Sequence, residues 1–177
     1  AQQKFPTGFV SEYLLGVAHQ TRKQYAVAVN HFTSAEHLAQ AGETNRLTSG
    51  FYFQLGAAFE RKGDRIEAGK YFEKCLSLAP DDAEALNYLG YMWAEKGEHL
   101  ERARSMIERA VKSEPTNAAF LDSLGWVMFQ LGQPREALKH LLQAIAQDDQ
   151  PDATVLDHLG DAYAALKEMA KAREAWA

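Results

Sequence analysis

Cysteine and proline are both scarce in this sequence. Of its 177 residues, one is a cysteine and five are prolines. A single thiol cannot form an intramolecular disulfide, and no second sulfur is available for a zinc site. Cys75 therefore fits best as a small, buried apolar residue. Because serine- or glycine-rich tracts are missing as well, the sequence leaves little room for a disordered linker.

An excess of basic residues is also missing. The chain has 19 Lys and Arg against 24 Asp and Glu, which gives a net charge of −5. Non-specific binding of nucleic acids depends on clustered basic side chains that displace counterions, so we do not expect a nucleic-acid partner. The charge balance suits a neutral or basic protein partner instead.

Long apolar runs are absent. Nothing in the sequence approaches the roughly 18–20 residues that cross a bilayer, so direct membrane insertion is not expected. The first residues, AQQKFPTG, are polar and short and do not resemble a signal peptide. A processed or truncated chain would look the same, so the compartment stays open.

Motifs of catalysis and of cofactor binding are missing too. The six histidines form no HExxH, and there is neither a glycine-rich phosphate loop nor a GxSxG elbow. We therefore predict a chain that is not an enzyme and has no cofactor and no metal site. Asp157 and Asp161 lie one helical turn apart, near Asp122, but carboxylates so spaced are more often a solvated helix face than a cation site. His158 is expected at a surface or an interface rather than as a metal ligand.

What the sequence does contain is one motif repeated five times. A Leu-Gly pair recurs at steps of 40, 34, 35 and 35 residues. The pairs stand at positions 15/16, 55/56, 89/90, 124/125 and 159/160. An alanine follows each glycine by twelve or thirteen residues, and large apolar residues keep the same phase. This periodicity predicts short pairs of amphipathic helices that must stack on one another to bury their apolar faces.

The glycines of these pairs stand inside predicted helices, where glycine costs roughly 0.5–1 kcal/mol relative to alanine. We expect a neighbouring helix to pack at each of them so closely that a Cβ atom would cost more, about 1–3 kcal/mol.

The order of Leu-Gly, aromatic, alanine and proline positions resembles the tetratricopeptide repeat over nearly the whole chain. The resemblance implies an all-α fold, a right-handed superhelical solenoid of antiparallel helix pairs that forms a single domain over residues 1–177. We expect about five repeats, at 9–42, 49–82, 83–117, 118–152 and 153–177, the last of them incomplete. The 40-residue step predicts an extra helical turn and a longer loop around residues 42–48.

One face of the first helix in each repeat carries residues that the repeat pattern does not require. Positions six and three before each glycine, and one and four after it, form a stripe beside the core stripe. Aromatic residues lie on it in the first four repeats, and acidic residues gather toward the C-terminal half. The candidate partner-binding residues are Tyr13, Phe53, Glu84, Asn87, Tyr91, Asp122, Trp126, Phe129, Asp157 and Asp161. The alternative is that the aromatic residues only pack between adjacent first helices.

Aromatic anchors beside acidic residues predict a scaffold or adaptor that binds an apolar, basic polypeptide segment in a concave groove. Chaperone-binding members of the family hold a C-terminal carboxylate with Lys, Asn and Arg on this face. The matching positions here, such as Tyr13, Gln54 and Ser123, supply no Lys or Arg, so we predict no clamp of that type. The alternative function is a self-assembly module of a larger bacterial protein, through a homo-oligomer that forms at uncapped ends.

The repeats at 83–152 look most like those of bacterial tetratricopeptide proteins, some of which are envelope lipoproteins. By this analogy a periplasmic or cell-envelope location is favoured over the cytoplasm.

Overall fold

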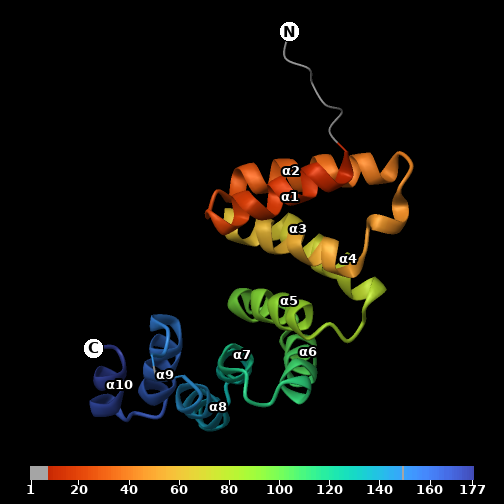
Figure 1. Cartoon of the computed structure of the whole chain (residues 1–177). Coiled ribbons are helices and arrows are strands. Elements are labelled where there is room, and N and C mark those ends of the chain that lie inside the picture. Colours follow the sequence, from red (N-terminus) through yellow and green to blue (C-terminus); the bar gives the residue numbers. More distant parts are fainter. Residues whose placement is uncertain (1–7, 149) are drawn as a thin grey trace. The chain divides into compact units, whose positions relative to one another are not determined.

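The computed structural model describes residues 8–148 and 150–177, and these residues form helices joined by turns and loops (Figure 1). The α-helices are α1 (Phe9–Thr21), α2 (Tyr25–Gln40), α3 (Ser49–Lys62), α4 (Arg65–Leu78), α5 (Ala83–Lys96), α6 (Leu100–Ser113), α7 (Ala118–Gln130), α8 (Pro134–Ala146), α9 (Ala153–Ala165) and α10 (Met169–Ala175). The described ranges contain no strand, which confirms the all-α prediction.

The polar start of the chain, residues 1–7, lies outside the described residues, and with it most of the segment that was compared with a signal peptide. Among the helices that are described, none combines the length and the apolar character needed to cross a membrane.

The helices group into two compact units, one that ends at Pro80 and one from Asp81 to Ala177. In the N-terminal unit, α1 packs against α2, α3 packs against α4, and α2 joins the two pairs by packing on α3. Phe32, Leu55 and Phe72 are fully buried in its core. The 40-residue step is taken up by α2, which is 16 residues long, and by a loop that contains the 3-10 helix η1 (Thr44–Arg46).

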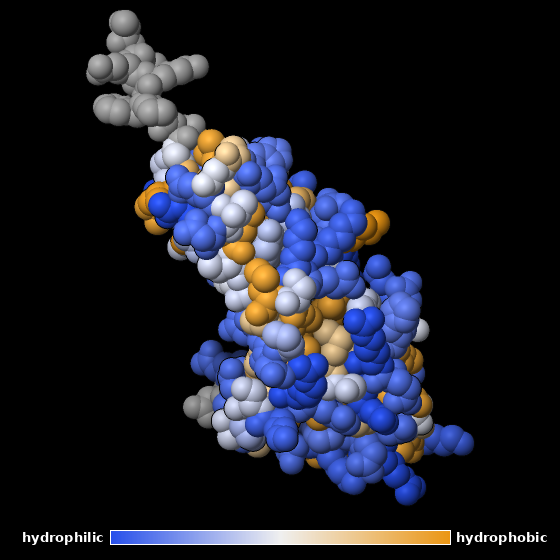
Figure 2. All heavy atoms as spheres, turned by 90° about the vertical axis from the view of Figure 1, so that its right-hand side faces the viewer, coloured by the Kyte–Doolittle hydropathy of each residue, from blue (hydrophilic) through white to orange (hydrophobic). Residues whose placement is uncertain are grey.

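In the C-terminal unit, three helix pairs follow one another: α5 with α6, α7 with α8, and α9 with α10. The pairs are joined because α6 packs on α7 and α8 packs on α9. Leu124, Val127 and Leu141 lie at the centre of one apolar cluster that reaches from α5 to α9. On the face seen in Figure 2, hydrophobic residues form patches between hydrophilic ones.

The glycines of the Leu-Gly pairs lie where two helices of a pair meet. A Cβ atom on Gly125 would stand 2.6 Å from Cγ of Leu141 and 3.2 Å from the carbonyl oxygen of Ala137. On Gly90 it would stand 2.8 Å from a side-chain carbon of Ile107. These distances are below ordinary contact, so the close packing predicted at these glycines is confirmed.

Side chains at the N-termini of α5, α7 and α9 fix where these helices begin. The carboxylate of Asp82 accepts a hydrogen bond from the backbone N–H of Ala85 at 2.9 Å, and that of Asp152 accepts one from Thr154 at 2.8 Å. Asn117 caps α7 in the same way. Such caps satisfy N–H groups that the helix itself leaves open. They set the register of the three helices that line the candidate site.

Candidate functional site

The first helices of the three C-terminal pairs form one layer. The central helix, α7, contacts α5 on one side and α9 on the other, whereas the second helices α6, α8 and α10 make no comparable contact with one another. The face predicted to bind a partner is therefore carried by helices that are themselves neighbours. Side chains from different repeats can act together on it.

A pocket of about 300 Å³ opens in this layer. We call it the α5–α7–α9 pocket. It is lined by Asn87, Tyr88, Tyr91, Ala119, Asp122, Ser123, Asp152, Thr154 and Val155. Three of the predicted binding residues thus line a single cavity, namely Asn87, Tyr91 and Asp122. The sequence placed them on one stripe, and the structure shows that the stripe is hollowed at this point.

A buried pair of polar side chains connects α7 to α9 beside the pocket. Oδ1 of Asp122 lies 2.9 Å from Nδ1 of His158, and each residue is only 7% exposed. Because a carboxylate can only accept, Nδ1 of His158 carries the proton and donates it. The expectation that His158 lies at a surface or an interface is wrong, since the packing of α9 against α7 encloses it. The sequence signal that could have indicated the pair, and was not used, is that Asp122 and His158 occupy neighbouring positions of successive repeats.

An aromatic cluster continues from this pair. The ring of His158 stacks on Trp126 with centroids 4.1 Å apart, and Trp126 stacks on Phe129 with centroids 5.3 Å apart. The Tyr91 ring lies 6.2 Å from that of His158. Trp126 and Phe129 are half-buried. They therefore pack against their neighbours and also present ring surface on the same face.

Two polar atoms near this cluster are buried without a partner. Asn87 is 9% exposed, and within the described residues its Oδ1 has no hydrogen-bond partner. The same holds for Nε1 of Trp126. A buried polar group without a partner costs free energy, so each such group in a folded protein points to an explanation such as a missing ligand.

The three remaining acidic candidates, Glu84, Asp157 and Asp161, are carried by α5 and α9, two of the helices that form the pocket. Glu84 and Asp157 are exposed, and Asp161 is half-buried. Within the described residues, no group of three or more His, Cys, Asp and Glu side chains is arranged to hold a metal ion.

Charge is segregated between the two kinds of helix in this unit. The first helices α5, α7 and α9 carry five carboxylates and one lysine, which are Glu84, Glu95, Asp122, Asp157, Asp161 and Lys96. The second helices carry eight basic residues, which are Arg102, Arg104, Arg109, Lys112, Arg135, Lys139, Lys171 and Arg173. The first helices thus carry a net negative charge, whereas the second helices, which have four carboxylates beside these basic residues, carry a net positive one.

The other two candidates, Tyr13 and Phe53, belong to the N-terminal unit. Tyr13 lies within 6.1 Å, centroid to centroid, of the Phe9, Phe32 and Phe51 rings. The Phe53 ring lies 5.8 Å from that of Phe72. Both are half-buried and take part in packing between helices. A binding role for them stays a prediction.

The N-terminal unit has a buried polar cluster of its own, which links α2 to α4. Glu36 is 3% exposed, and it accepts hydrogen bonds from the Tyr71 hydroxyl at 2.8 Å and from Nζ of Lys74 at 3.0 Å. Burial, and then the hydrogen bond to Glu36, raise the pKa of Tyr71 well above the ordinary value for tyrosine. These contacts satisfy the carboxylate within the fold, so the cluster is structural. The repeat pattern did not single out Glu36.

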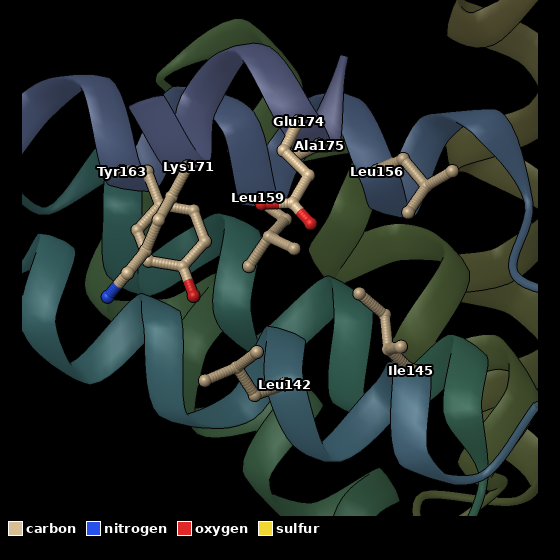
Figure 3. Close-up of a pocket in the computed structure, with 8 residues that line it drawn as sticks. All are labelled: Leu142, Ile145, Leu156, Leu159, Tyr163, Lys171, Glu174 and Ala175. Carbon is tan, nitrogen blue, oxygen red and sulfur yellow. The ribbon is translucent and has the colours of Figure 1, made fainter. Parts of the chain in front are cut away.

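A second cavity lies between α8, α9 and α10, with a volume of about 390 Å³ (Figure 3). Its lining is mostly apolar: Leu142, Ile145, Leu156, Leu159, Tyr163 and Ala175, together with Lys171 and Glu174. Leu142 is 45% exposed here. This cavity is on the other side of α9 from the α5–α7–α9 pocket, because it faces α8 and α10.

Comparisons with solved structures show the same architecture. MamA of Desulfovibrio magneticus RS-1 is 18% identical, with a TM-score of 0.76 over 95% of this chain and 90% of that one. PilF of Pseudomonas aeruginosa is 18% identical, with a TM-score of 0.70 over 94% and 72%. The APC/C hetero-tetramer Cut9–Hcn1 provides a chain that is 17% identical, with a TM-score of 0.78 over 97% and 33%. At such identities the likeness establishes the fold alone.

No curated protein sequence matches the chain at a significant level. The family model described as a tetratricopeptide repeat matches residues 10–177, which is nearly the whole sequence. The repeated helix pairs, the glycines that admit close packing and this match lead to one conclusion: the chain belongs to the tetratricopeptide repeat family.

Proposed function

We propose that this chain is a non-enzymatic scaffold whose C-terminal unit captures an apolar, basic segment of a partner polypeptide on α5, α7 and α9. Tetratricopeptide repeat proteins are scaffolds for protein–protein interaction, and membership of the family supports the general role. One structural neighbour, Cut9–Hcn1, is itself a complex of proteins. The identity of the face and the chemistry of the segment are inferred from the site.

One observation carries the proposal: a pocket, an aromatic cluster and an excess of carboxylates over basic residues are found on the same three helices, α5, α7 and α9. Half-buried aromatic rings supply apolar contact area at low cost in side-chain entropy, which is why they are common at the centres of interfaces. A face with an excess of carboxylates favours a partner with Lys or Arg. The second helices, rich in basic residues, would repel such a segment.

The test is a charge reversal on the face, compared with an equal reversal elsewhere. Asp157→Lys with Asp161→Lys replaces two carboxylates of α9 by two ammonium groups. Fluorescence anisotropy against an array of labelled peptides of about 12 residues, each with apolar residues and one or more Lys or Arg, measures affinity. We expect the double variant to bind the best peptides about three- to tenfold more weakly, since each lost exposed pair is worth up to about 1 kcal/mol.

The matched control is Glu108→Lys with Glu136→Lys on α6 and α8, which changes the net charge equally. Both residues are exposed and form ion pairs with residues on their own helices, Arg104 and Lys139. This variant should keep the affinity of the unmodified chain. Equal weakening in both variants would show that net charge alone, and not this face, governs binding.

A second candidate function is self-association, and the apolar cavity between α8, α9 and α10 favours it (Figure 3). Light scattering at several concentrations checks it, with Leu142→Glu as the variant that places a charge at the cavity. A mass that stays monomeric at every concentration counts against self-association. A mass that rises with concentration, but not in Leu142→Glu, supports it.

A further inference from the structure

The α5–α7–α9 pocket is lined by carboxylates and by neutral side chains, without a basic one. The pocket has two carboxylates, Asp122 and Asp152, and no Lys, Arg or His among its lining residues. The Ser123 hydroxyl donates its hydrogen bond to the backbone carbonyl oxygen of Ala119, at 2.9 Å. An anionic ligand would meet two carboxylates and no basic side chain here, whereas a cationic ligand would meet acceptors.

Asn87 supplies a second, independent sign of a missing donor. More than nine-tenths of this residue is buried, it lines the pocket, and its Oδ1 has no partner in the described part of the chain. A buried amide oxygen that accepts nothing is costly, and a donor that enters the pocket would remove that cost.

Asp122 is held in a fixed position, because His158 donates to its Oδ1 at 2.9 Å. A guanidinium group binds a carboxylate best through two parallel hydrogen bonds, one to each oxygen. Because one oxygen of Asp122 already accepts a hydrogen bond from His158, a guanidinium group fits poorly there. An ammonium group is a compact cation with three donors that can point in different directions, so it suits the remaining capacity of Asp122 together with Oδ1 of Asn87.

The other walls of the pocket are apolar or aromatic. Tyr88 and Tyr91 contribute rings, and Ala119 and Val155 contribute aliphatic surface. Lysine has a stem of four methylene groups that packs on such surface while its charged end reaches polar partners. Aromatic faces within about 6 Å of an ammonium group attract it further.

We propose that the α5–α7–α9 pocket is a subsite for one lysine side chain of the captured segment, whose ammonium group is held by Asp122 and Asn87. This inference rests on the proposed function, because the lysine belongs to the segment bound on α5, α7 and α9. It adds a position-specific requirement that a generally acidic face would not impose.

The experiment uses the full chain and the array peptides that bind most tightly. In each peptide one lysine at a time is replaced by norleucine, which keeps the length of the stem and removes the charge, and then by arginine. At one position we expect norleucine to bind about tenfold more weakly, as loss of hydrogen bonds to a charged group implies. Arginine should be intermediate there, and the other lysine positions should change affinity about threefold or less.

Two variants of the chain assign the effect to the pocket. Asp122→Asn keeps an acceptor for His158 and removes the charge, and Asn87→Leu keeps the shape of the side chain and removes the acceptor. Each should bring the affinity ratio of lysine to norleucine at the selective position close to one. Asp157→Asn removes an equal charge from an exposed residue of the same face that does not line the pocket. It is the control for the ratio: it should weaken the lysine and norleucine peptides alike and leave their affinity ratio unchanged.

The outcomes separate the two proposals. If the lysine and norleucine peptides bind with equal affinity at each position tested, the subsite proposal is overturned. The proposed scaffold function is then left intact. A ratio that survives in both Asp122→Asn and Asn87→Leu would also overturn it. If no peptide binds, both proposals fail together. Circular dichroism confirms that each variant is folded, and if one is not, the other still decides.

Discussion

At the residue scale, the pair of Asp122 and His158 is the most informative feature of the molecule. It joins α7 to α9 through a hydrogen bond in a place that is almost closed to water. His158 is also the ring on which Trp126 stacks. One histidine thus fixes the orientation of a carboxylate and of the largest aromatic residue on the proposed binding face.

Replacing this histidine measures what the hydrogen bond contributes. His158→Phe keeps a flat ring against Trp126 but removes the N–H, which leaves the Asp122 carboxylate buried without its donor. We expect the free energy of unfolding to fall by about 1.5–3 kcal/mol, the range for hydrogen bonds to charged groups. Urea denaturation followed by circular dichroism provides the measurement.

His140→Phe on α8 is the matched control for that variant. His140 is half-buried, and within the described residues its Nδ1 has no hydrogen-bond partner. Because its replacement removes no hydrogen bond to Nδ1, we expect the free energy of unfolding not to fall. A comparable loss in both variants would mean that ring replacement, and not the bond to Asp122, is responsible.

Glycine residues within helices give a second prediction at this scale. Gly125→Ala would place a methyl group 2.6 Å from Leu141, so we expect it to destabilise the fold by about 1–3 kcal/mol. Gly50 lies in α3, and a Cβ atom added there would have only Oγ1 of Thr48 near it, at 3.9 Å. There the gain in helix propensity should prevail and stabilise the chain by up to about 1 kcal/mol. Thermal unfolding of the two variants checks both predictions: the melting temperature should fall in Gly125→Ala and rise in Gly50→Ala.

At the scale of elements, second helices in the N-terminal unit are joined by side chains rather than by apolar contact alone. Glu36 of α2 is bonded to Tyr71 and Lys74 of α4. The Lys74 ammonium also lies 4.4 Å from the centroid of the Tyr71 ring. These contacts fix α2 relative to α4, two helices that are not partners within a repeat.

This link predicts how stability depends on alkaline pH. The pKa of Tyr71 is raised above its ordinary value of 10.0 in the folded chain, first by burial and then by the hydrogen bond to Glu36. The unfolded chain therefore releases this proton first. The stability that protonated Tyr71 contributes is therefore complete below about pH 10, and it is lost as the pH rises through the pKa of Tyr71 in the folded chain.

Urea unfolding between about pH 8 and about pH 11 measures the free energy of unfolding, which should fall above about pH 10. In the Tyr71→Phe variant this free energy should fall less steeply with pH. Tyr25→Phe replaces a tyrosine outside the Glu36 cluster and is the control that should keep the original slope. If Tyr71→Phe and Tyr25→Phe fall equally steeply with pH, the link does not act through Tyr71.

At the scale of the whole molecule, the chain consists of two compact units, each with its own buried core. The α5–α7–α9 pocket, the aromatic cluster and the charge segregation all lie in the C-terminal unit. The N-terminal unit contributes Tyr13 and Phe53 to the candidate binding residues, and both take part in packing.

We expect the fragment from Asp81 to Ala177 to fold by itself and to bind the same array peptides as the full chain, within about threefold in affinity. Its three helix pairs bury a continuous apolar cluster, which a repeat array needs for independent stability. Circular dichroism and peptide binding check this. A folded fragment that binds no peptide would place essential binding residues in the N-terminal unit.

The helices were predictable because their signals are local. The Leu-Gly spacing, the alanines in phase and residues such as Asn117 and Asp152 at helix starts predict where helices begin and how they pair. The candidate site was only partly predictable. Asn87, Tyr91 and Asp122 were identified from their place on one helix stripe, but the donor of Asp122 and the burial of Glu36 were not.

The sequence by itself therefore determined the fold class, because short amphipathic helix pairs repeated along a chain bury their apolar faces by stacking on one another. It also determined the sign of the charge on the first helices of the C-terminal half. Only the tertiary structure decided which of these charges are buried, which are paired and where the stripe is hollow. The reason is that Asp122 and His158 lie 36 residues apart, and their contact depends on how α9 packs against α7, which no local pattern specifies.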